Sequence, residues 1–146
     1  MSTDRIVLHA AIAEKFIAAL KAALSSTDAS APVPTLVTAA SKARVQKIIS
    51  SAVTSGAHFI HGAGQNSEQG TKDKDVRFAP VILGGAREDM DLWQDEAFAP
   101  LAACMTVKDD DEAVRVANKG GYGLSASVFT EDLRKGFALA KRLESG

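Results

Sequence analysis

Apolar residues recur at helical spacing in several stretches of this chain. The first stretch has an apolar residue at every fourth position and predicts a helix over Ala10–Leu24: Ile12, Phe16, Leu20 and Leu24. The second gives the clearest pattern, because its apolar residues share one helical face: Val45, Ile48, Ile49, Ala52 and Val53. Gly56 follows at the position where a left-handed residue commonly ends a helix. Two amphipathic helices are therefore expected in the first half of the chain.

Two shorter helices are predicted in the last third of the chain. Asp109 and Glu112 have the spacing of a capping box, which predicts a helix over Glu112–Asn118. Thr130 can cap a last helix. The apolar residues of that helix are expected to face inward: Leu133, Phe137 and Ala140.

Short apolar runs lie between these helices and predict five strands: Arg5–His9, Ala57–His61, Ala79–Leu83, Leu101–Val107 and Ser125–Phe129. Several runs are continuous rather than alternating, which is typical of strands buried on both faces of a parallel sheet. Strands that interleave with helices indicate an α/β fold. We therefore expect one α/β domain over residues 1–146, with a layered, parallel-type sheet and flanking helices.

Composition and charge narrow the classes of function. The formal net charge of −1 is spread along the chain, and the single tryptophan and single tyrosine also argue against a nucleic-acid partner. No apolar run approaches the roughly 18 residues of a membrane-spanning helix, so no membrane partner is expected. No basic and apolar leader precedes Arg5, which predicts a cytoplasmic protein.

The cysteine and the histidines give little sign of a reactive or metal site. Cys104 is the only cysteine, which excludes an internal disulfide, and its mid-strand place in LAACMTV predicts a buried, inert thiol. His9, His58 and His61 lack the spacing of metal ligands, so no metal is expected. His61 stands near a strand end before a glycine and is the best of the three as a proton-transfer group.

The stretch WQDEAFAP is the densest in candidate chemistry. Asp95 and Glu96 precede Phe98, and Pro100 then begins a strand. A carboxylate beside an aromatic ring at a strand entrance can hold a ribose diol or act as an acid or base. The same spacing fits an exposed acidic turn without any chemical role. The spacing alone leaves both interpretations open.

Together these segments resemble the catalytic domain of the aldehyde dehydrogenase superfamily. The longest matching segment reads DEAFAPLAACMTVKDDDEAVRVANKGGYGLSASVFTEDLRKGFALAKRLESG. It is similar to the family pattern of E-x-F-G-P, a strand, a D-x-D-E-A helix start and A-N-x-x-x-Y-G-L. Three shorter blocks also match: STDRIVLHAAIAEKF, ARVQKIISSAVTSGA and VRFAPVIL. The pattern is nearest to the fungal salicylaldehyde and vanillin dehydrogenase branch.

The resemblance implies a truncated family member. Met1 falls directly after the position of the nucleophilic cysteine, so that cysteine, the upstream general-base glutamate and the nucleotide-binding Rossmann domain are expected to be missing. Aldehyde oxidation needs a thiolate, a bound NAD and a base, so we expect neither dehydrogenase activity nor a cofactor. Glu96 and Phe98 match family residues that contact the nicotinamide ribose. Ala99 replaces a usual glycine, which would cost about 1 kcal/mol if the backbone there needs a positive φ.

The first of three functional hypotheses is a repurposed enzyme. The former active-site cleft would bind a small hydrophobic metabolite and promote a cofactor-free isomerisation or cyclisation. Its expected catalytic residues are Glu96, His61 and Tyr122, and its expected substrate-binding residues are Trp93 and Phe98.

The other two hypotheses need no catalysis. The chain is either a non-catalytic module that binds a partner protein, or a fragment without a function of its own. The helix that carries Val45–Val53 lies at the dimer contact in the resembling enzymes, so a homodimer is expected. An enzyme should show a concave pocket with convergent polar groups, whereas a binding module should show an exposed apolar patch.

Overall fold

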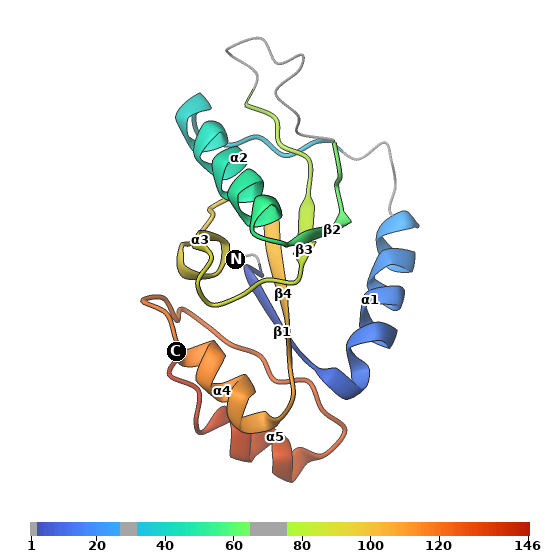
Figure 1. Ribbon diagram of the computed structural model, residues 1–146. Helices are drawn as coiled ribbons and strands as arrows, with labels where there is room; N and C mark the ends of the chain where they lie inside the picture. The colour runs from blue at the N-terminus through green and yellow to red at the C-terminus, as the bar shows by residue number, and fades with distance from the viewer. Residues whose placement is uncertain (1–2, 27–31, 65–75) are drawn as a thin grey trace.

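The computed structural model describes residues 3–26, 32–64 and 76–146. They form these elements in chain order (Figure 1): β1 (Arg5–His9), α1 (Ala10–Ser25), α2 (Ala39–Thr54), β2 (His58–His61), β3 (Val81–Gly84), α3 (Asp91–Gln94), β4 (Leu101–Val107), α4 (Asp110–Asn118) and α5 (Leu133–Ala140). The short helix α3 was not predicted. The predicted strand Ser125–Phe129 was wrong, because no strand of the described chain lies beside this segment to pair with it.

The strands form one sheet in the order β1-β4-β3-β2. β1 and β3 both pair in parallel with β4, and β2 pairs antiparallel with β3 at one edge. The α/β fold class is thus confirmed, but the sheet is mixed and not wholly parallel. An antiparallel edge strand on an otherwise parallel sheet is a common arrangement, and the apolar content of a strand does not reveal its direction.

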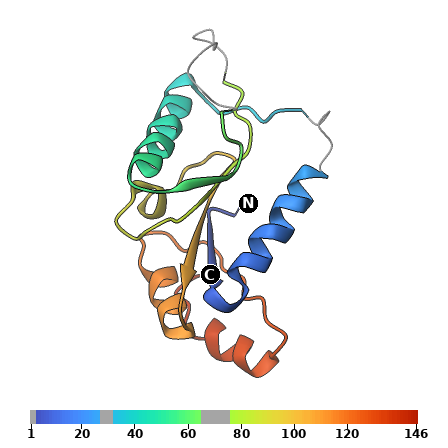
Figure 2. The ribbon, with the colours of Figure 1, turned by 45° about the vertical axis from the view of Figure 1, so that its right-hand side comes forward.

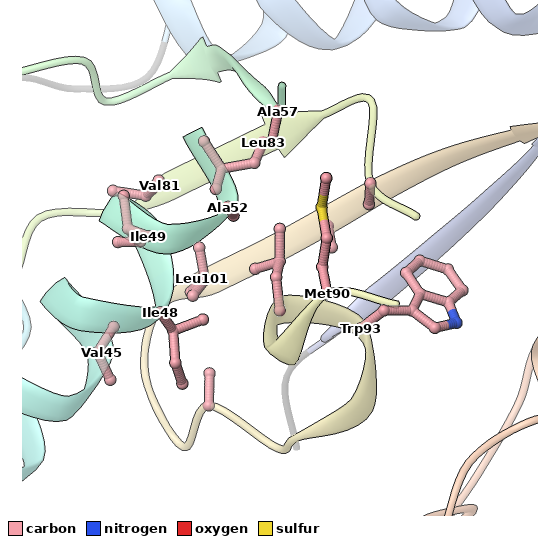
Figure 3. Close-up of a cluster of buried hydrophobic side chains, with 14 of the residues drawn as sticks. Val45, Ile48, Ile49, Ala52, Ala57, Val81, Leu83, Met90, Trp93 and Leu101 are labelled. Carbon is pink, nitrogen blue, oxygen red and sulfur yellow. The ribbon is translucent and has the colours of Figure 1, made fainter. Parts of the chain in front are cut away.

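Helices cover both faces of the sheet (Figures 1 and 2). On one face, α2 and α3 bury their apolar residues against β3 and β4 in the larger core cluster. Figure 3 shows Ile49 of α2 beside Val81 and Ile48 beside Leu101 of the strands. On the other face, α1 packs in a smaller cluster around Leu8, Ala13, Ile60 and Cys104.

The inward face of α1 differs from the predicted stripe in the first half of the helix. Leu20 packs against the smaller cluster as predicted, but there Ala13 is buried and Ile17 packs inward, whereas Ile12 is 51% and Phe16 37% exposed. The helix is apolar on more than one side, so spacing alone could not select the face that packs. In the described parts of the chain, no helix combines the length and the apolar character needed to cross a membrane.

The end of α2 and the start of α4 follow the predicted signals closely. Gly56 adopts φ +103° after α2, and the amides of Gly56 and Ala57 donate to the carbonyls of Val53 and Ala52, which is a Schellman motif. Asp109 caps α4 by accepting the Glu112 amide at 2.8 Å. The Glu112 carboxylate reaches back to the amide of Lys108, one residue before the cap.

The last helix differs from its prediction. Its cap is Asp132, which accepts the amides of Arg134 and Lys135, and Thr130 accepts only the Asp132 amide. No residue of α5 is buried, and Leu133 and Phe137 are 75% and 68% exposed. The expectation that they face inward was wrong, because the contacts that hold α5 to the rest of the chain are polar.

Candidate functional site

The carboxyl group of Asp4, where β1 begins, is close enough to Glu96 to be affected by its charge. Asp4 directly precedes β1, and its carbonyl accepts the Ala103 amide of β4 at 2.8 Å, which fixes its backbone to the sheet. Burial raises the pKa of the Asp4 carboxyl, the negative charge of Glu96 raises it further, and Arg5 opposes both. Asp4 therefore keeps its proton to a higher pH than a free aspartate.

The loop that carries Glu96 is held by α2. The Arg44 guanidinium donates from Nη2 to the carbonyls of Ala97 at 2.7 Å and Glu96 at 3.1 Å. Phe98 adopts φ +49°, the only positive φ of a non-glycine residue in the described parts of the chain. This left-handed conformation costs about 1–2 kcal/mol, and it presents a ring that is 82% exposed. The conditional penalty expected at Ala99 does not arise, because the positive φ lies one residue earlier.

Trp93 does not line an open site. Its side chain is fully buried in α3, and its indole N–H points to the Val116 carbonyl at 3.4 Å. The Arg5 guanidinium lies 5.5 Å from the ring centroid, within the range of a cation–π contact. The prediction that Trp93 binds substrate therefore needs correction: a wide apolar ring inserts into the core, and no dissolved ligand reaches it there.

His61 and Tyr122 are not gathered with Glu96 into one pocket. His61 lies on β2 and pairs with Ile82, whereas Glu96 lies near the start of β1, at the opposite edge of the sheet. Three strand spacings separate β1 from β2, which is ~14 Å. Tyr122 is 49% exposed and follows Gly120, where a Cβ would lie 2.6 Å from Nη1 of Arg5. The Tyr122 segment therefore passes near Arg5, but His61 does not.

Cys104 has no features of a nucleophile. It lies in β4 with 3% of its surface exposed, and burial raises the pKa of its thiol to about 11. At neutral pH almost none of it is thiolate. The described residues contain no group of three or more histidine, cysteine, aspartate or glutamate side chains arranged to hold a metal ion.

Two shallow hollows in the described surface lie away from the carboxyl pair. One, of about 610 Å³, is open and lined mainly by charged and polar residues: Arg87, Glu88, Asp89, Gln94, Thr106 and Lys119. The other, of about 510 Å³, lies between residues 125–130 and α5. Neither is lined by any predicted site residue. Asp4 and Glu96 are half-buried, and the ring of Phe98 projects into solvent outside both hollows.

Sequence reasoning missed two residues of this site. Asp4 stands alone before a strand, and no local motif separates it from any other surface aspartate. Arg44 lies on α2, more than fifty residues before the loop that it holds. Its outward position on an amphipathic helix looks like ordinary solvated charge. Only the tertiary fold brings either residue to Glu96.

Comparisons with known proteins agree with these geometric findings on the fold. The model of the aldehyde dehydrogenase family matches residues 1–146, the whole chain. Vanillin dehydrogenase of Pseudomonas fluorescens is 31% identical over 152 aligned positions, which span all of this chain and 30% of that protein. An aldehyde dehydrogenase of Talaromyces stipitatus is 29% identical, and the match spans 99% of this chain and 30% of the relative. The resemblance to the vanillin dehydrogenase type, with a fungal relative, is confirmed.

A solved structure gives the same result. Succinate-semialdehyde dehydrogenase from Burkholderia pseudomallei superposes with a TM-score of 0.82 at 28% identity. The superposition covers 97% of this chain and 30% of that one. The chain thus spans about 30% of the length of the relatives that it matches.

Proposed function

This chain belongs to the aldehyde dehydrogenase family, and on that premise we propose that its 146 residues do not oxidise aldehydes by themselves. We propose instead that they bind a small hydrophobic metabolite and move a proton within it, without a nicotinamide cofactor. The observation that carries this proposal is that Asp4, at the start of β1, and Glu96, in the loop that also carries the exposed Phe98, are close enough for the charge of Glu96 to act on Asp4.

The first part of the proposal rests on the missing thiolate. Thiohemiacetal formation needs a thiolate that an aldehyde can reach. Cys104 is the only cysteine of the chain, and its thiol is buried with a pKa near 11. Glu96 and Phe98 match family contacts to the nicotinamide ribose, but one ribose contact is too little to hold a dinucleotide.

The second part rests on two carboxyl groups in different environments. Two neighbouring carboxyl groups, one protonated and one ionised, can divide the roles of acid and base. When Asp4 carries its proton, it would donate that proton to a carbonyl oxygen while the carboxylate of Glu96 takes the proton from the adjacent carbon, which gives an enol. For isomerisation, Glu96 would deliver its proton to another carbon of the enol while the enol O–H returns its proton to Asp4. For ring closure, the enol carbon would attack a second carbonyl of the same molecule, whose oxygen takes the proton from Glu96, while the enol O–H returns its proton to Asp4.

Phe98 would supply the ligand contact. Its ring faces solvent, and the Arg44 hydrogen bonds to the Glu96 and Ala97 carbonyls fix the two residues that precede the strained Phe98. A planar, apolar ligand could stack on this ring with its carbonyl toward the carboxyl pair. His61 and Trp93 have no part in this arrangement, and Tyr122 stays a candidate neighbour through Gly120 and Arg5.

Exchange of carbon-bound hydrogen tests the proposal directly. Aromatic ketones and aldehydes with α-hydrogens are incubated in D₂O, and NMR follows the loss of the α-proton signal with the protein present. We expect exchange above the buffer rate, and a loss of at least ~100-fold of the added rate in Glu96→Gln, because the general base is gone. Glu14→Gln, which removes an exposed carboxylate of α1, should exchange like the parent protein.

Two results would contradict this function. One is exchange no faster than buffer for every compound tested, and the other is an unchanged rate in Glu96→Gln. A parallel assay with NAD⁺ or NADP⁺ and benzaldehyde should give no reduced nucleotide, and its formation would disprove the first part of the proposal.

A second candidate function is that of a non-catalytic binding module, and a different observation favours it. Large apolar side chains are exposed after the end of α4: Tyr122, Leu124, Phe129, Leu133 and Phe137. The helix α2, where a homodimer contact is expected from the resemblance, has mostly polar outward residues: Arg44, Lys47, Ser50, Ser51 and Thr54. Association through the C-terminal segment is therefore the better supported form of this candidate.

We also propose a cytoplasmic location. The single cysteine is free and buried, as suits a reducing compartment. Fractionation of cells that express a tagged chain checks this expectation, and recovery from the medium or an organelle would contradict it.

A further inference from the structure

The helix α1 begins with an imidazole as its cap. His9, the last residue of β1, is extended (φ −65°, ψ 134°), and its Nδ1 accepts the amide of Ala11 at 3.1 Å. The other helices with a side-chain cap in the described ranges use oxygen acceptors: Thr38 for α2, Asp109 for α4 and Asp132 for α5. The start of α1 therefore depends on a nitrogen atom that can take up a proton.

Protonation of His9 would remove this cap. A neutral imidazole has one nitrogen that accepts a hydrogen bond, whereas both nitrogens of the charged ring are donors. The added charge would also stand at the positive end of the helix dipole. The first turn of α1 has no acidic side chain that could offset this charge. Imidazole side chains change their charge between about pH 5 and 8, so mild acid would weaken the start of the helix.

The charged groups that follow the neighbouring strand are paired with one another. His9 lies opposite the last residue of β4 in the register of the sheet, and Lys108 and Asp109 come directly after that residue. Lys108 and Asp109 form an ion pair at 4.0 Å, and the next residue, Asp110, pairs with Lys135 of α5 at 2.9 Å. The positive and negative charges at this end of β4 therefore largely offset each other.

A second imidazole lies on the same side of the sheet as α1. A Cβ at Gly84 would lie 2.6 Å from Nε2 of His58 and 3.1 Å from Cδ1 of Ile60, and Ile60 belongs to the cluster that α1 covers. On α1 itself the first charged residues are Glu14 and Lys15, more than one turn beyond the cap and opposite in sign. His58 is thus the other group through which pH could act on the packing of α1.

The helix α1 covers one face of the sheet through a small contact. Ala13 is buried, and Ile17 and Leu20 pack beside it in the cluster that holds Leu8 and Cys104. The larger cluster lies on the opposite face, so few apolar contacts oppose a local opening of α1. Cys104 is 3% exposed while the helix is in place. It has no chemical role here, but its thiol reports whether the helix has opened.

We propose that the His9 cap makes α1 an acid-sensitive cover of this face. The neutral ring holds the first turn of the helix closed. When the ring takes up a proton, the helix opens from its N-terminal end more often and exposes the apolar face beneath it. The stability that the cap contributes is therefore present while the imidazole is neutral and is lost as the pH falls. This proposal is independent of the acid–base function at Asp4 and Glu96.

The rate at which Cys104 is labelled measures the opening. The full chain reacts with a dithiodipyridine reagent at about pH 8 and about pH 5.5, on either side of imidazole titration. Each rate is divided by that of glutathione at the same pH, which removes the effect of pH on the thiol chemistry itself. We expect the normalised rate to be roughly fivefold higher at the lower pH, as the loss of one helix cap predicts. Amide hydrogen exchange, corrected for its intrinsic pH dependence, should locate the added opening in α1.

Two variants separate the cap from the other imidazole. His9→Asn keeps a side-chain acceptor that does not titrate, so it should be labelled as slowly as the parent at the higher pH and should lose the rise in acid. His58→Gln is the matched control: it removes the second imidazole on this side of the sheet and should keep the rise. Far-UV circular dichroism at both pH values checks that each variant is folded. A parent without the rise, a rise that persists in His9→Asn or disappears in His58→Gln, or exchange that accelerates throughout the chain would overturn the proposal.

Discussion

Two regions of this molecule are stabilised in different ways. The sheet, α2, α3 and the segment before β3 contain all of the most deeply buried large side chains except one, Val116 of α4: Trp93, Phe78, Leu83, Val45 and Val81. After Val116 the chain continues for another thirty residues without a buried one. That C-terminal region, residues 117–146, is attached through ion pairs and side-chain hydrogen bonds.

This difference separates the region whose buried residues drive folding from the region whose apolar residues remain exposed to other molecules. Apolar burial contributes about 25 cal/mol per Å² and drives folding of the first region. Exposed ion pairs contribute little, with a median of about 0–1 kcal/mol each. The C-terminal region therefore has well-formed local structure but a small share of the total stability, and its apolar side chains remain free for association.

Two leucine-to-alanine substitutions, one in each region, test this difference in stabilisation most directly. Leu83→Ala leaves a cavity under a fully buried side chain in β3 and should lower the free energy of unfolding by about 2–5 kcal/mol. Leu133→Ala, on an exposed position of α5, should change it by less than about 0.5 kcal/mol. Urea denaturation at a concentration where the chain is monomeric measures both. Equal losses would mean that the two regions form one cooperative unit with comparable packing.

The two aspartate helix caps give a smaller and sharper comparison. Asp109→Ala removes the hydrogen bond to the Glu112 amide and should cost about 1 kcal/mol of global stability, because α4 contributes Val116 to the core. Asp132→Ala removes two comparable bonds of α5 but should leave the urea midpoint nearly unchanged. Its effect should appear as faster amide hydrogen exchange confined to α5. A midpoint shift as large as that of Asp109→Ala would contradict the division into regions.

The smallest expected effect is a loss of thermal stability at acidic pH. Hydrogen bonds from Arg115 and Lys119 of the α4 side lower the pKa of Glu88, before α3, from 4.5 to about 2. A carboxyl group whose pKa is lowered by folding stabilises the folded state fully at pH values above its pKa in the unfolded chain. This contribution is lost as the pH falls from about 4.5 to about 2. Thermal unfolding should therefore show a loss of stability over this interval that is reduced in Glu88→Gln. The same dependence of thermal stability on pH in both proteins would show that the hydrogen bonds of Glu88 with Arg115 and Lys119 contribute nothing to stability.

Much of the first region was predictable from the sequence, because its signals are local. Continuous apolar runs identified β1 and β4, and the single-faced stripe of α2 with Gly56 behind it located that helix and its end. The Asp109 cap followed from a four-residue motif. Each of these features depends on residues within a few positions of one another, and the core then forms from elements that were already specified.

The second region and the site depended on distant residues and were not predictable in this way. The stripe of α5 correctly indicates an amphipathic helix, but spacing cannot state whether its apolar side meets the core or a second molecule. Glu96 was identified from its aromatic neighbour, whereas Asp4 and Arg44 reach it only through the pairing of β1 with β4 and the packing of α2. Trp93 was assigned to a ligand because a large aromatic ring has the same sequence signature in a core and in a cleft.

The pairing of β1 with β4 also has a consequence for synthesis on the ribosome. Arg5 of β1 pairs opposite Ala103 of β4, and the chain between them is roughly a hundred residues long. At about 5–20 residues per second, β1 waits on the order of 5–20 s for its partner strand. During that interval Ile6, Val7 and Leu8 have no sheet to join, and α1 follows them directly. The nascent chain should therefore bind holding chaperones early and release them only once β4 has left the exit tunnel.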